Sequence, residues 1–238
     1  MSWKPNLPEH VREFNDSERY ITTPWNKYPI YSEQLYTRSE SDTLFHRVMQ
    51  DGFPNHTHHT VYKENGVEGQ LDRSVRDTHD LSNALTYLRN QGVNTRLREA
   101  SERGTAYITG ATVKLRPAVS LQILGYERLG KFISHADSHI YTHTPQGMGW
   151  INNSPERKFS GICWLSQYVQ TPGRSNEFNG GIIRFPYLND AQGKVLEIRP
   201  QAGQFVLFPS HPLYTHEILP VIRGYRVALV FFWDKESV

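Results

Sequence analysis

The 238-residue sequence has little cysteine, little net charge and no long hydrophobic run, and each absence excludes a class of protein. Its one cysteine, Cys163, excludes an intrachain disulfide and a zinc site built on paired cysteines. Lysine and arginine exceed aspartate and glutamate by only 26 − 24 = 2, with no long basic run, which argues against nucleic acid as a partner. The longest purely apolar run, Val227 to Trp233, is far shorter than the ~20 residues that cross a membrane.

The N-terminal residues also lack the basic patch and apolar stretch of a secretory signal, which predicts a cytoplasmic protein. Aromatic residues, in contrast, make up 12% of the chain and are sufficient for a sizeable core. Cys163 lies in an apolar segment and is expected to be a small core residue. A metal would have to be held by carboxylates and by some of the 11 histidines.

Helix signals come first in the chain. Helices are expected at Glu40–Gln50, Leu81–Asn90 and Thr95–Arg103. Ser39 is expected to cap the first helix, and Gly104 to end the third.

After about Tyr107, short runs rich in Val, Ile, Phe and Tyr alternate with Gly, Pro and Asn, which indicates strands and turns. The predicted strands are Leu121–Tyr126, Phe132–Asp137, Phe159–Gln167, Gly181–Phe185, Val195–Arg199, Gln204–Phe208, Thr215–Leu219 and Tyr225–Trp233. Ile140–Glu156 shows little periodicity and is expected to be a long loop. Helices followed by strands predict a mainly β fold in α+β order, with a double-sheet jelly roll or related barrel.

The sharpest local signal is His135-Ala136-Asp137 at the end of a predicted strand. Side chains two residues apart on a strand point to the same face, so His135 and Asp137 are expected to project together. An imidazole and a carboxylate on one face supply two thirds of a two-histidine, one-carboxylate triad for non-haem Fe(II). This short motif is common, so by itself it does not establish a metal site.

A second signal lies further along the chain, where Arg226 follows His216 after 226 − 216 = 10 positions. This interval predicts a hairpin with a turn around Pro220–Gly224, which places His216 on one strand and Arg226 on the next. A guanidinium among apolar neighbours needs a charged partner, and its planar fork fits a carboxylate. The pair is what a metal-chelating dicarboxylic co-substrate requires.

Together these segments resemble the Fe(II)/2-oxoglutarate-dependent dioxygenases, and within them the prolyl 4-hydroxylase-like branch. The resemblance covers roughly Gln122 to Asp234. It rests on the order and spacing of Leu121–Tyr126, His135–Asp137, Gly180–Pro186, Pro200–Gly203, Leu207–Ser210, His216–Val221 and Arg226–Leu229.

The resemblance implies a site as well as an activity. His135, Asp137 and His216 would bind Fe(II), and Arg226 would hold the distal carboxylate of 2-oxoglutarate. Tyr126 matches a tyrosine whose hydroxyl reaches that carboxylate, the alternative being a core aromatic. The implied cofactors are Fe(II), 2-oxoglutarate and O2, with ascorbate in support. Asp137 fills a position that is a small residue in related halogenases, which favours hydroxylation.

The family fold implied by the resemblance is a double-stranded β-helix, or jelly roll, with N-terminal helices packed on one sheet. Residues 1–238 are then expected to form one dioxygenase domain. Within it, residues 1–106 would supply an N-terminal arm and supporting helices, and residues 107–238 the jelly-roll catalytic core.

Four residues are candidates for substrate contact. Arg157 matches a position that faces the substrate in prolyl hydroxylases, although an arginine at a strand start is commonly just solvated. Arg73 and Arg76 would offer cationic contacts to an acidic or carboxylate-bearing substrate if their segment covers the mouth of the barrel. Trp164 either lines the cavity or lies in the core.

Two further histidine-containing segments are weighed against the metal site. On an extended strand His139 would share the face of His135 and compete as a ligand, the alternative being a polar strand-end or loop residue. The tract Asn55–Thr60 has the composition of a metal site but no acidic neighbour in the sequence, and is expected to be an exposed loop.

The resulting prediction is a hydroxylase of an unactivated carbon in a prolyl peptide, a free amino acid or a small metabolite. The alternative is a catalytically idle jelly-roll module that keeps its metal site as a sensor or scaffold. The intact set of His135, Asp137, His216 and Arg226 argues against that alternative. Long inserts at Ile140–Glu156 and Gln170–Asn179 would flank the mouth, so substrate identity does not transfer from the family.

Overall fold

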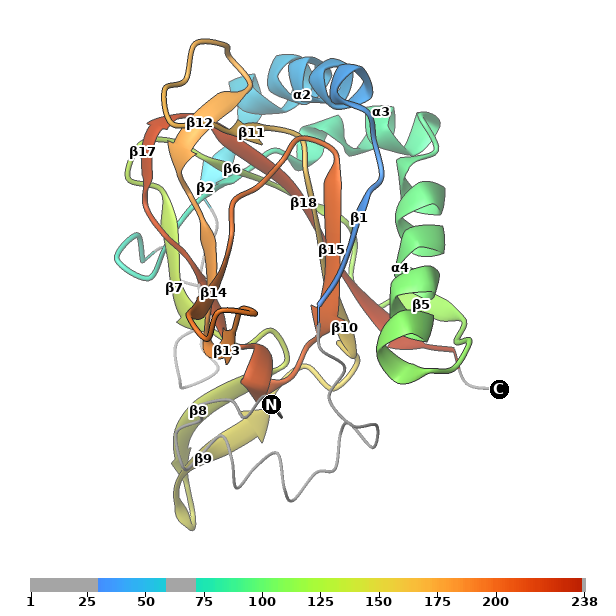
Figure 1. The fold of residues 1–238 in the computed structure, drawn as a ribbon, viewed down its shortest axis with the longest axis vertical. Coiled ribbons are helices and arrows are strands. Elements are labelled where there is room, and N and C mark those ends of the chain that lie inside the picture. Colours follow the sequence, from blue (N-terminus) through green and yellow to red (C-terminus); the bar gives the residue numbers. More distant parts are fainter. Residues whose placement is uncertain (1–29, 59–71, 237–238) are drawn as a thin grey trace.

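The computed structural model describes residues 30–58 and 72–236, which form two facing β-sheets with helices on one side (Figure 1). The larger sheet has the strand order β1-β15-β10-β18-β6-β4-β2, with β5 paired to β18. Its strands are β1 (Tyr31–Gln34), β2 (Thr57–His58), β4 (His79–Asp80), β5 (Leu115–Pro117), β6 (Gln122–Tyr126), β10 (Phe159–Trp164), β15 (Gln204–Pro209) and β18 (Arg226–Lys235). The arm predicted for the first 29 residues lies outside the described residues.

The smaller sheet has the order β14-β13-β16-β7-β3. Its strands are β3 (Arg76–Asp77), β7 (Lys131–His135), β13 (Ile183–Asn189), β14 (Val195–Ile198) and β16 (His216–Ile218). Two small sheets accompany it, one of β11 (Gln167–Tyr168), β12 (Glu177–Gly180) and β17 (Val221–Gly224), the other of β8 (His139–Thr144) and β9 (Gly147–Asn152). This arrangement is the mainly β jelly roll that the sequence predicts.

All eight predicted strands are present, but the predicted loop Ile140–Glu156 is wrong. The segment forms the β8–β9 hairpin, in which His139 pairs with Asn152 and Thr144 with Gly147. Gly147 has φ +114°, a backbone conformation that a side chain disfavours, so the Pro145-Gln146-Gly147 turn closes the hairpin. Both faces of this hairpin are largely polar, with scattered apolar residues, so the sequence shows no alternation of apolar and polar residues that would have predicted strands.

The predicted helices exist with different ends. The first is α2 (Arg38–Gly52), and Thr37 caps it in a capping box with Glu40, not Ser39 as predicted. The second is a short 3-10 turn, η2 (Ser82–Ala84), followed by α3 (Leu85–Asn90).

The third helix, α4 (Val93–Thr109), passes through Gly104 instead of ending there. A Cβ atom at Gly104 would lie 2.7 Å from the Cδ1 atom of Tyr31, so this glycine permits close packing on β1. The helix ends at Gly110, whose φ is +73°.

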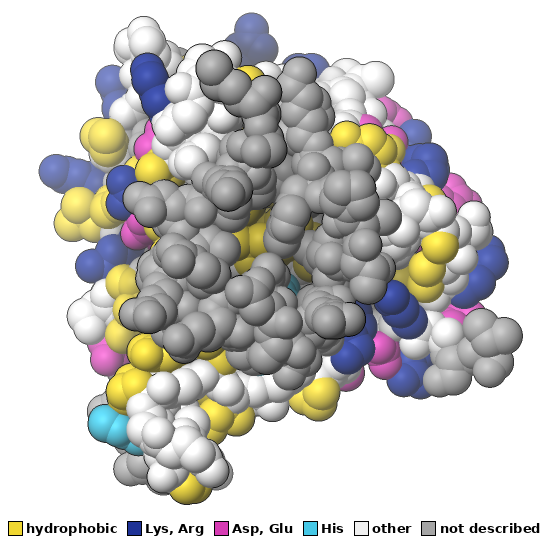
Figure 2. Space-filling view, turned by 60° about the horizontal axis from the view of Figure 1, so that its bottom comes forward, with side chains coloured by type: hydrophobic (Ala, Val, Ile, Leu, Met, Phe, Trp, Pro, Cys, Tyr) yellow, Lys and Arg dark blue, Asp and Glu magenta, His cyan; other side chains and the backbone are white. Residues whose placement is uncertain are grey.

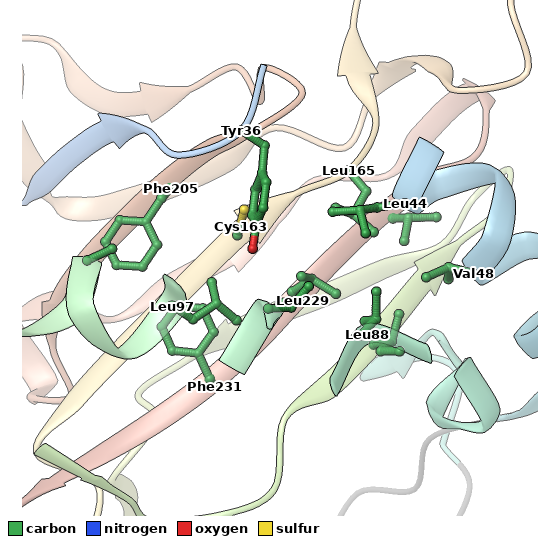
Figure 3. Close-up of a cluster of buried hydrophobic side chains, with 14 of the residues drawn as sticks. Tyr36, Leu44, Val48, Leu88, Leu97, Cys163, Leu165, Phe205, Leu229 and Phe231 are labelled. Atoms are coloured by element: carbon green, nitrogen blue, oxygen red, sulfur yellow. The ribbon is translucent and has the colours of Figure 1, made fainter. Parts of the chain in front are cut away.

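Two hydrophobic clusters hold these layers together. The first lies between the helices and the larger sheet, where side chains such as Leu44, Leu97 and Phe231 meet (Figure 3). Cys163 belongs to it and is fully buried, as predicted, and burial raises the pKa of its thiol. The second cluster, which includes Trp164 and Phe208, fills the space between the two sheets.

Two other predictions about local structure are wrong. His216 and Arg226 do not share a hairpin, because β16 pairs with β13 and β7 in the smaller sheet while β18 pairs with β10, β6 and β5 in the larger one. The chain crosses between sheets through β17. The tract Asn55–Thr60, as far as it is described, is not an exposed loop, since His58 in β2 pairs with His79 in β4. Within residues 30–58 and 72–236, no helix is long and apolar enough to cross a membrane.

Candidate metal and co-substrate site

Three potential metal ligands converge on the inner face of the smaller sheet. His135, the last residue of β7, and His216, the first of β16, are directly paired across antiparallel strands. Asp137 follows two residues after His135. One ligand atom from each of the three lies within 4.8 Å of the others. Two imidazoles and a carboxylate in this arrangement make a donor set that suits Fe(II).

Hydrogen bonds fix both rings in the orientation that a metal needs. The Nδ1 atom of His135 donates to the carbonyl oxygen of Ile133 at 2.8 Å, and that of His216 to the carbonyl of Tyr214 at 3.0 Å. A carbonyl oxygen only accepts, so Nδ1 carries the proton and Nε2 keeps its lone pair. The Nε2 atoms face Asp137, at 3.5 Å from Oδ1 for His135 and 3.9 Å from Oδ2 for His216.

For His216 the electrostatics favour the same protonation state. Burial lowers the pKa of His216 to about 4, so its imidazole is neutral near pH 7. Burial alone would raise the pKa of the Asp137 carboxyl, but the imidazoles of His216 and His135 favour the carboxylate and hold that pKa below its usual range. A neutral imidazole at His216 and a carboxylate at Asp137 are the forms that coordinate a cation.

Arg226 lies opposite this group, on the larger sheet. It is the cross-strand partner of Tyr126, its guanidinium carbon is 4.6 Å from the centre of that ring, and only 1% of the residue is exposed. Its Nε atom is buried without a hydrogen-bond partner, and no carboxylate of the described residues pairs with it. A buried, unpaired guanidinium is costly, so the geometry fits an anionic ligand such as the distal carboxylate of 2-oxoglutarate.

One cavity of about 590 Å³ joins the two halves of the site. His135, Asp137 and His216 line it from the smaller sheet, and Tyr126 and Arg226 line it from the larger one. Ile140 and Asn153, at the base of the β8–β9 hairpin, also line this cavity, and hydrophobic side chains lie on the surface of the hairpin (Figure 2).

The structure separates the candidate substrate residues. Arg157 lines the cavity, where its Nη1 atom donates to the backbone oxygen of Asp137 at 3.1 Å. Arg76 lines it too, but Arg73 does not and instead pairs with Asp77 on the surface, at 2.8 Å. Trp164 is fully buried in the cluster between the sheets and does not line the cavity.

The competing histidine, His139, lies outside the metal group. It is buried, its Nδ1 atom shares a hydrogen bond with Ser138 Oγ at 2.7 Å, and its ring faces His211 at 6.3 Å. The expectation that it shares the face of His135 fails because β7 ends at His135 and a turn intervenes. Phe232 also lines the cavity, as strand alternation with Arg226 predicts, whereas sequence reasoning missed Phe132, which lines it from β7.

Comparison with known proteins defines the class. Residues 121–234 match the family model of the 2OG-Fe(II) oxygenase superfamily. No curated protein sequence matches the chain. A prolyl-4-hydroxylase from Pseudomonas putida is similar in structure, with 15% identity, a TM-score of 0.55, and 88% of this chain and 94% of that chain covered.

Two further solved structures share the fold. A prolyl hydroxylase from Trichoplax adhaerens, in complex with a hypoxia inducible factor oxygen degradation domain peptide fragment, gives 13% identity and a TM-score of 0.59 over 96% of this chain and 94% of that chain. A 2OG-Fe(II) oxygenase family oxidoreductase from Burkholderia pseudomallei gives 15% identity and a TM-score of 0.50 over 99% and 95%.

Residues 121–234, which carry His135, Asp137, His216 and Arg226, match one class, the 2OG-Fe(II) oxygenases, whose members are enzymes that use Fe(II), 2-oxoglutarate and O2, and the described fold agrees with that class. Among the solved structures, the chain shares its fold with the prolyl hydroxylases from Pseudomonas putida and Trichoplax adhaerens.

Proposed function

We propose that the protein is an Fe(II)- and 2-oxoglutarate-dependent hydroxylase whose iron ligands are His135, Asp137 and His216. The observation that supports this most is that three convergent ligands share one cavity with the buried guanidinium of Arg226, whose Nε atom has no hydrogen-bond partner. With Fe(II), 2-oxoglutarate and O2 bound, the site supplies oxidation of a substrate C–H bond to C–OH, coupled to conversion of 2-oxoglutarate to succinate and CO2.

The residues of the chain have separate tasks in this reaction. The backbone carbonyls of Ile133 and Tyr214 hold the protons on Nδ1 of the two histidines, so each Nε2 stays a ligand through the cycle. Arg226 remains protonated at any working pH and forms charge-assisted hydrogen bonds with the distal carboxylate of 2-oxoglutarate. Tyr126, against the guanidinium, orients the same carboxylate through its hydroxyl.

The aromatic residues around the ligands exclude water. The ring of Phe132 stacks on His135 with centroids 3.7 Å apart, and Phe208 packs edge-on to His216 at 5.2 Å. Exclusion of water strengthens the ionic contacts of the site and limits side reactions.

We further propose that the substrate carries a carboxylate, as a free amino acid, a small metabolite or an acidic peptide. Arg76 and Arg157 line the cavity without an ion pair to any described carboxylate. Their guanidinium carbons lie over Phe132 and Phe232, at 4.8 and 4.3 Å from the ring centres. The peptide in the Trichoplax adhaerens structure favours a peptide ligand for this fold, while the unpaired arginines favour an anionic one.

Succinate release tests the proposed reaction. The enzyme with Fe(II) and 2-oxoglutarate should form succinate in air and none without O2. Asp137→Ala should abolish this release, whereas His143→Ala, at an exposed histidine on β8, should not change it. Equal succinate release by Asp137→Ala and the unmodified protein would refute the ligand assignment, whereas no succinate release by the unmodified protein would favour the idle-module alternative.

Product analysis tests the substrate class. Cell extract incubated with enzyme, Fe(II) and 2-oxoglutarate should contain a carboxylate-bearing compound that gains one oxygen atom. For that compound, Arg157→Gln should raise KM by about tenfold or more, the cost of one lost charge-assisted contact. The KM for 2-oxoglutarate should stay the same. A neutral product, or no change in KM, would remove the arginines from substrate recognition.

A further inference from the structure

A second cluster of histidines lies at the edge of the larger sheet, apart from the residues of the catalytic cavity. His56 and His58 come from the tract around β2, and His79 comes from β4. His58 and His79 are directly paired across the antiparallel strands. The ring centroid of His79 lies 4.2 Å from that of His56 and 4.7 Å from that of His58. The centroids of His135 and His216 at the catalytic site are 4.4 Å apart, which is a similar spacing.

The cluster lies on the opposite face of the sheet from the catalytic cavity. The Nδ1 atom of His79 is hydrogen-bonded to the hydroxyl of Tyr225 at 2.9 Å. Tyr225 precedes Arg226, and successive residues of an extended strand point to opposite faces. Tyr225 accordingly packs against the helix-side core while Arg226 lines the cavity. The histidine cluster is therefore a separate feature of the molecule.

The hydrogen bonds leave ring nitrogens of the cluster open for a ligand. His56 Nδ1 donates to the carbonyl oxygen of Phe53 at 2.5 Å, so His56 Nε2 carries a free lone pair, as at the catalytic histidines. His58 Nδ1 is buried without a hydrogen-bond partner.

Two carboxylates supply the negative charge that a cation needs. Glu127 Oε1 lies 3.6 Å from His79 Nε2, and Asp77 Oδ1 lies 3.7 Å from His58 Nδ1. Arg73 already binds Asp77, at 2.8 Å, and its Nη2 atom is 4.0 Å from Glu127. Glu127 is thus the less committed carboxylate and the better fourth ligand.

We propose that His56, His58 and His79 bind a transition-metal ion of the Zn²⁺ class, with Glu127 completing the coordination. Imidazoles and a carboxylate are ligands of Zn²⁺, which favours four-coordinate sites. Among the described residues, only His135, Asp137 and His216 have all their ligand atoms within 4.8 Å of one another, so the second site closes by rotation of its side chains around the ion. The bound ion ties the short edge strand β2 to β4, to which two pairs of described residues otherwise join it.

Zinc titration measured by calorimetry tests the proposal in the full-length protein. The unmodified protein should bind two equivalents of Zn²⁺, one at the catalytic ligands and one at the cluster. A variant with His58→Ala and His79→Ala should bind one equivalent and keep iron-dependent succinate release. The matched control His143→Ala, at an exposed histidine of β8, should still bind two.

A second background removes the catalytic site instead. A variant with His135→Ala and His216→Ala should bind one Zn²⁺, and adding His79→Ala should weaken that binding by at least about tenfold. Far-UV circular dichroism checks that each variant is folded. Binding of a single equivalent by the unmodified protein would overturn the proposal. A second equivalent that survives His58→Ala with His79→Ala would also overturn it, since the ion would then bind elsewhere.

Discussion

Arg226 stands out among single residues because it is buried against Tyr126 with no described carboxylate beside it. No described carboxylate compensates the charge of its guanidinium, so we expect this residue to act by binding an anionic ligand. The two histidine ligands, His135 and His216, are different in kind, since the hydrogen bonds that orient their rings are already in place. The two halves of the site can therefore be altered one at a time.

Replacement of Arg226 should weaken 2-oxoglutarate binding without affecting the metal. Arg226→Gln removes charge-assisted hydrogen bonds worth roughly 1.5–3 kcal/mol each. We expect a loss of about 3–5 kcal/mol, or two to four orders of magnitude in affinity. Arg226→Lys keeps the charge but not the planar fork and should fall between. Titration of 2-oxoglutarate onto the metal-loaded protein measures this, and metal affinity without 2-oxoglutarate is the control. An unchanged affinity in Arg226→Gln would mean that the co-substrate is anchored elsewhere.

Two buried histidines outside the site should make stability depend on pH. Burial lowers the pKa of His139 to about 4 and that of His211 to about 3, from an ordinary value of 6.5. Below about pH 6.5 these histidines bind protons in the unfolded chain but stay neutral in the folded chain. The free energy of unfolding therefore falls as the pH falls toward 4. Each histidine contributes a slope of about 1.4 kcal/mol per pH unit in that window.

Urea denaturation at a series of pH values from 7 to 4 measures this slope. His211→Asn, which keeps a side-chain acceptor for the backbone N–H of Leu213, should reduce the slope by the contribution of one histidine. His143→Ala, at an exposed position, should not change it. A His211→Asn slope equal to that of the unmodified protein would show that His211 titrates normally in the folded state.

Among the elements, α2 shows how a single cap residue fixes where a helix begins. The backbone N–H of Glu40 donates to Thr37 Oγ1 at 3.2 Å, and the backbone N–H of Thr37 donates to the Glu40 carboxylate at 2.7 Å. Thr37→Ala should lower the free energy of unfolding by about 1 kcal/mol. Ser39→Ala, just inside the helix, should change it little. Chemical denaturation measures both, and equal losses would mean that the cap is not the source of the stability.

The β8–β9 hairpin extends from the edge of the cavity, where Ile140 and Asn153 mark its base. Shortening its tip by removal of residues 143–148 should lower kcat/KM for the substrate by about tenfold or more, equivalent to 1.4 kcal/mol. Uncoupled turnover of 2-oxoglutarate, which depends on the ligands and Arg226, should persist. Comparison of succinate release with and without substrate measures the split. An equal fall in both would show that the hairpin supports the fold instead of the substrate.

The sequence predicts elements well where apolar period and local chemistry agree. The eight predicted strands, which all lie in the two main sheets, follow from runs of Val, Ile, Phe and Tyr. The sequence did not predict the β8–β9 hairpin because Ile140, Tyr141 and Ile151 are all partly exposed. No single buried face therefore produces an alternating pattern. The prediction that Gly104 ends a helix was wrong for a different reason. This glycine permits packing against Tyr31, which lies on a strand far away in the sequence.

At the scale of the whole molecule, the two halves of the site lie on different sheets. The metal ligands come from β7 and β16 in the smaller sheet, and Arg226 and Tyr126 from β18 and β6 in the larger one. A ligand that binds the metal and Arg226 together bridges both sheets. Sequence spacing found these residues but not this arrangement, because ten positions fit a hairpin as well as a crossing through β17.

Co-substrate should therefore stabilise the protein only when a metal is present. At a concentration about 100 times its Kd, 2-oxoglutarate should add about 2.7 kcal/mol to the free energy of unfolding. Thermal unfolding without O2, with Mn²⁺ as the metal, measures this gain. The gain should vanish in Arg226→Gln. An equal gain without metal would mean that 2-oxoglutarate binds without chelation.

The place of β18 in the larger sheet has a consequence for how the protein is made. It is the last of the described strands in the chain, yet it pairs with β10 on one side and with β6 and β5 on the other. During synthesis the edges of β10 and β6 stay unpaired until residues 226–235 emerge. Open strand edges with apolar faces invite pairing with other chains. The nascent protein is thus most exposed to aggregation before residues 226–235 emerge, and it becomes able to bind co-substrate only after they have paired.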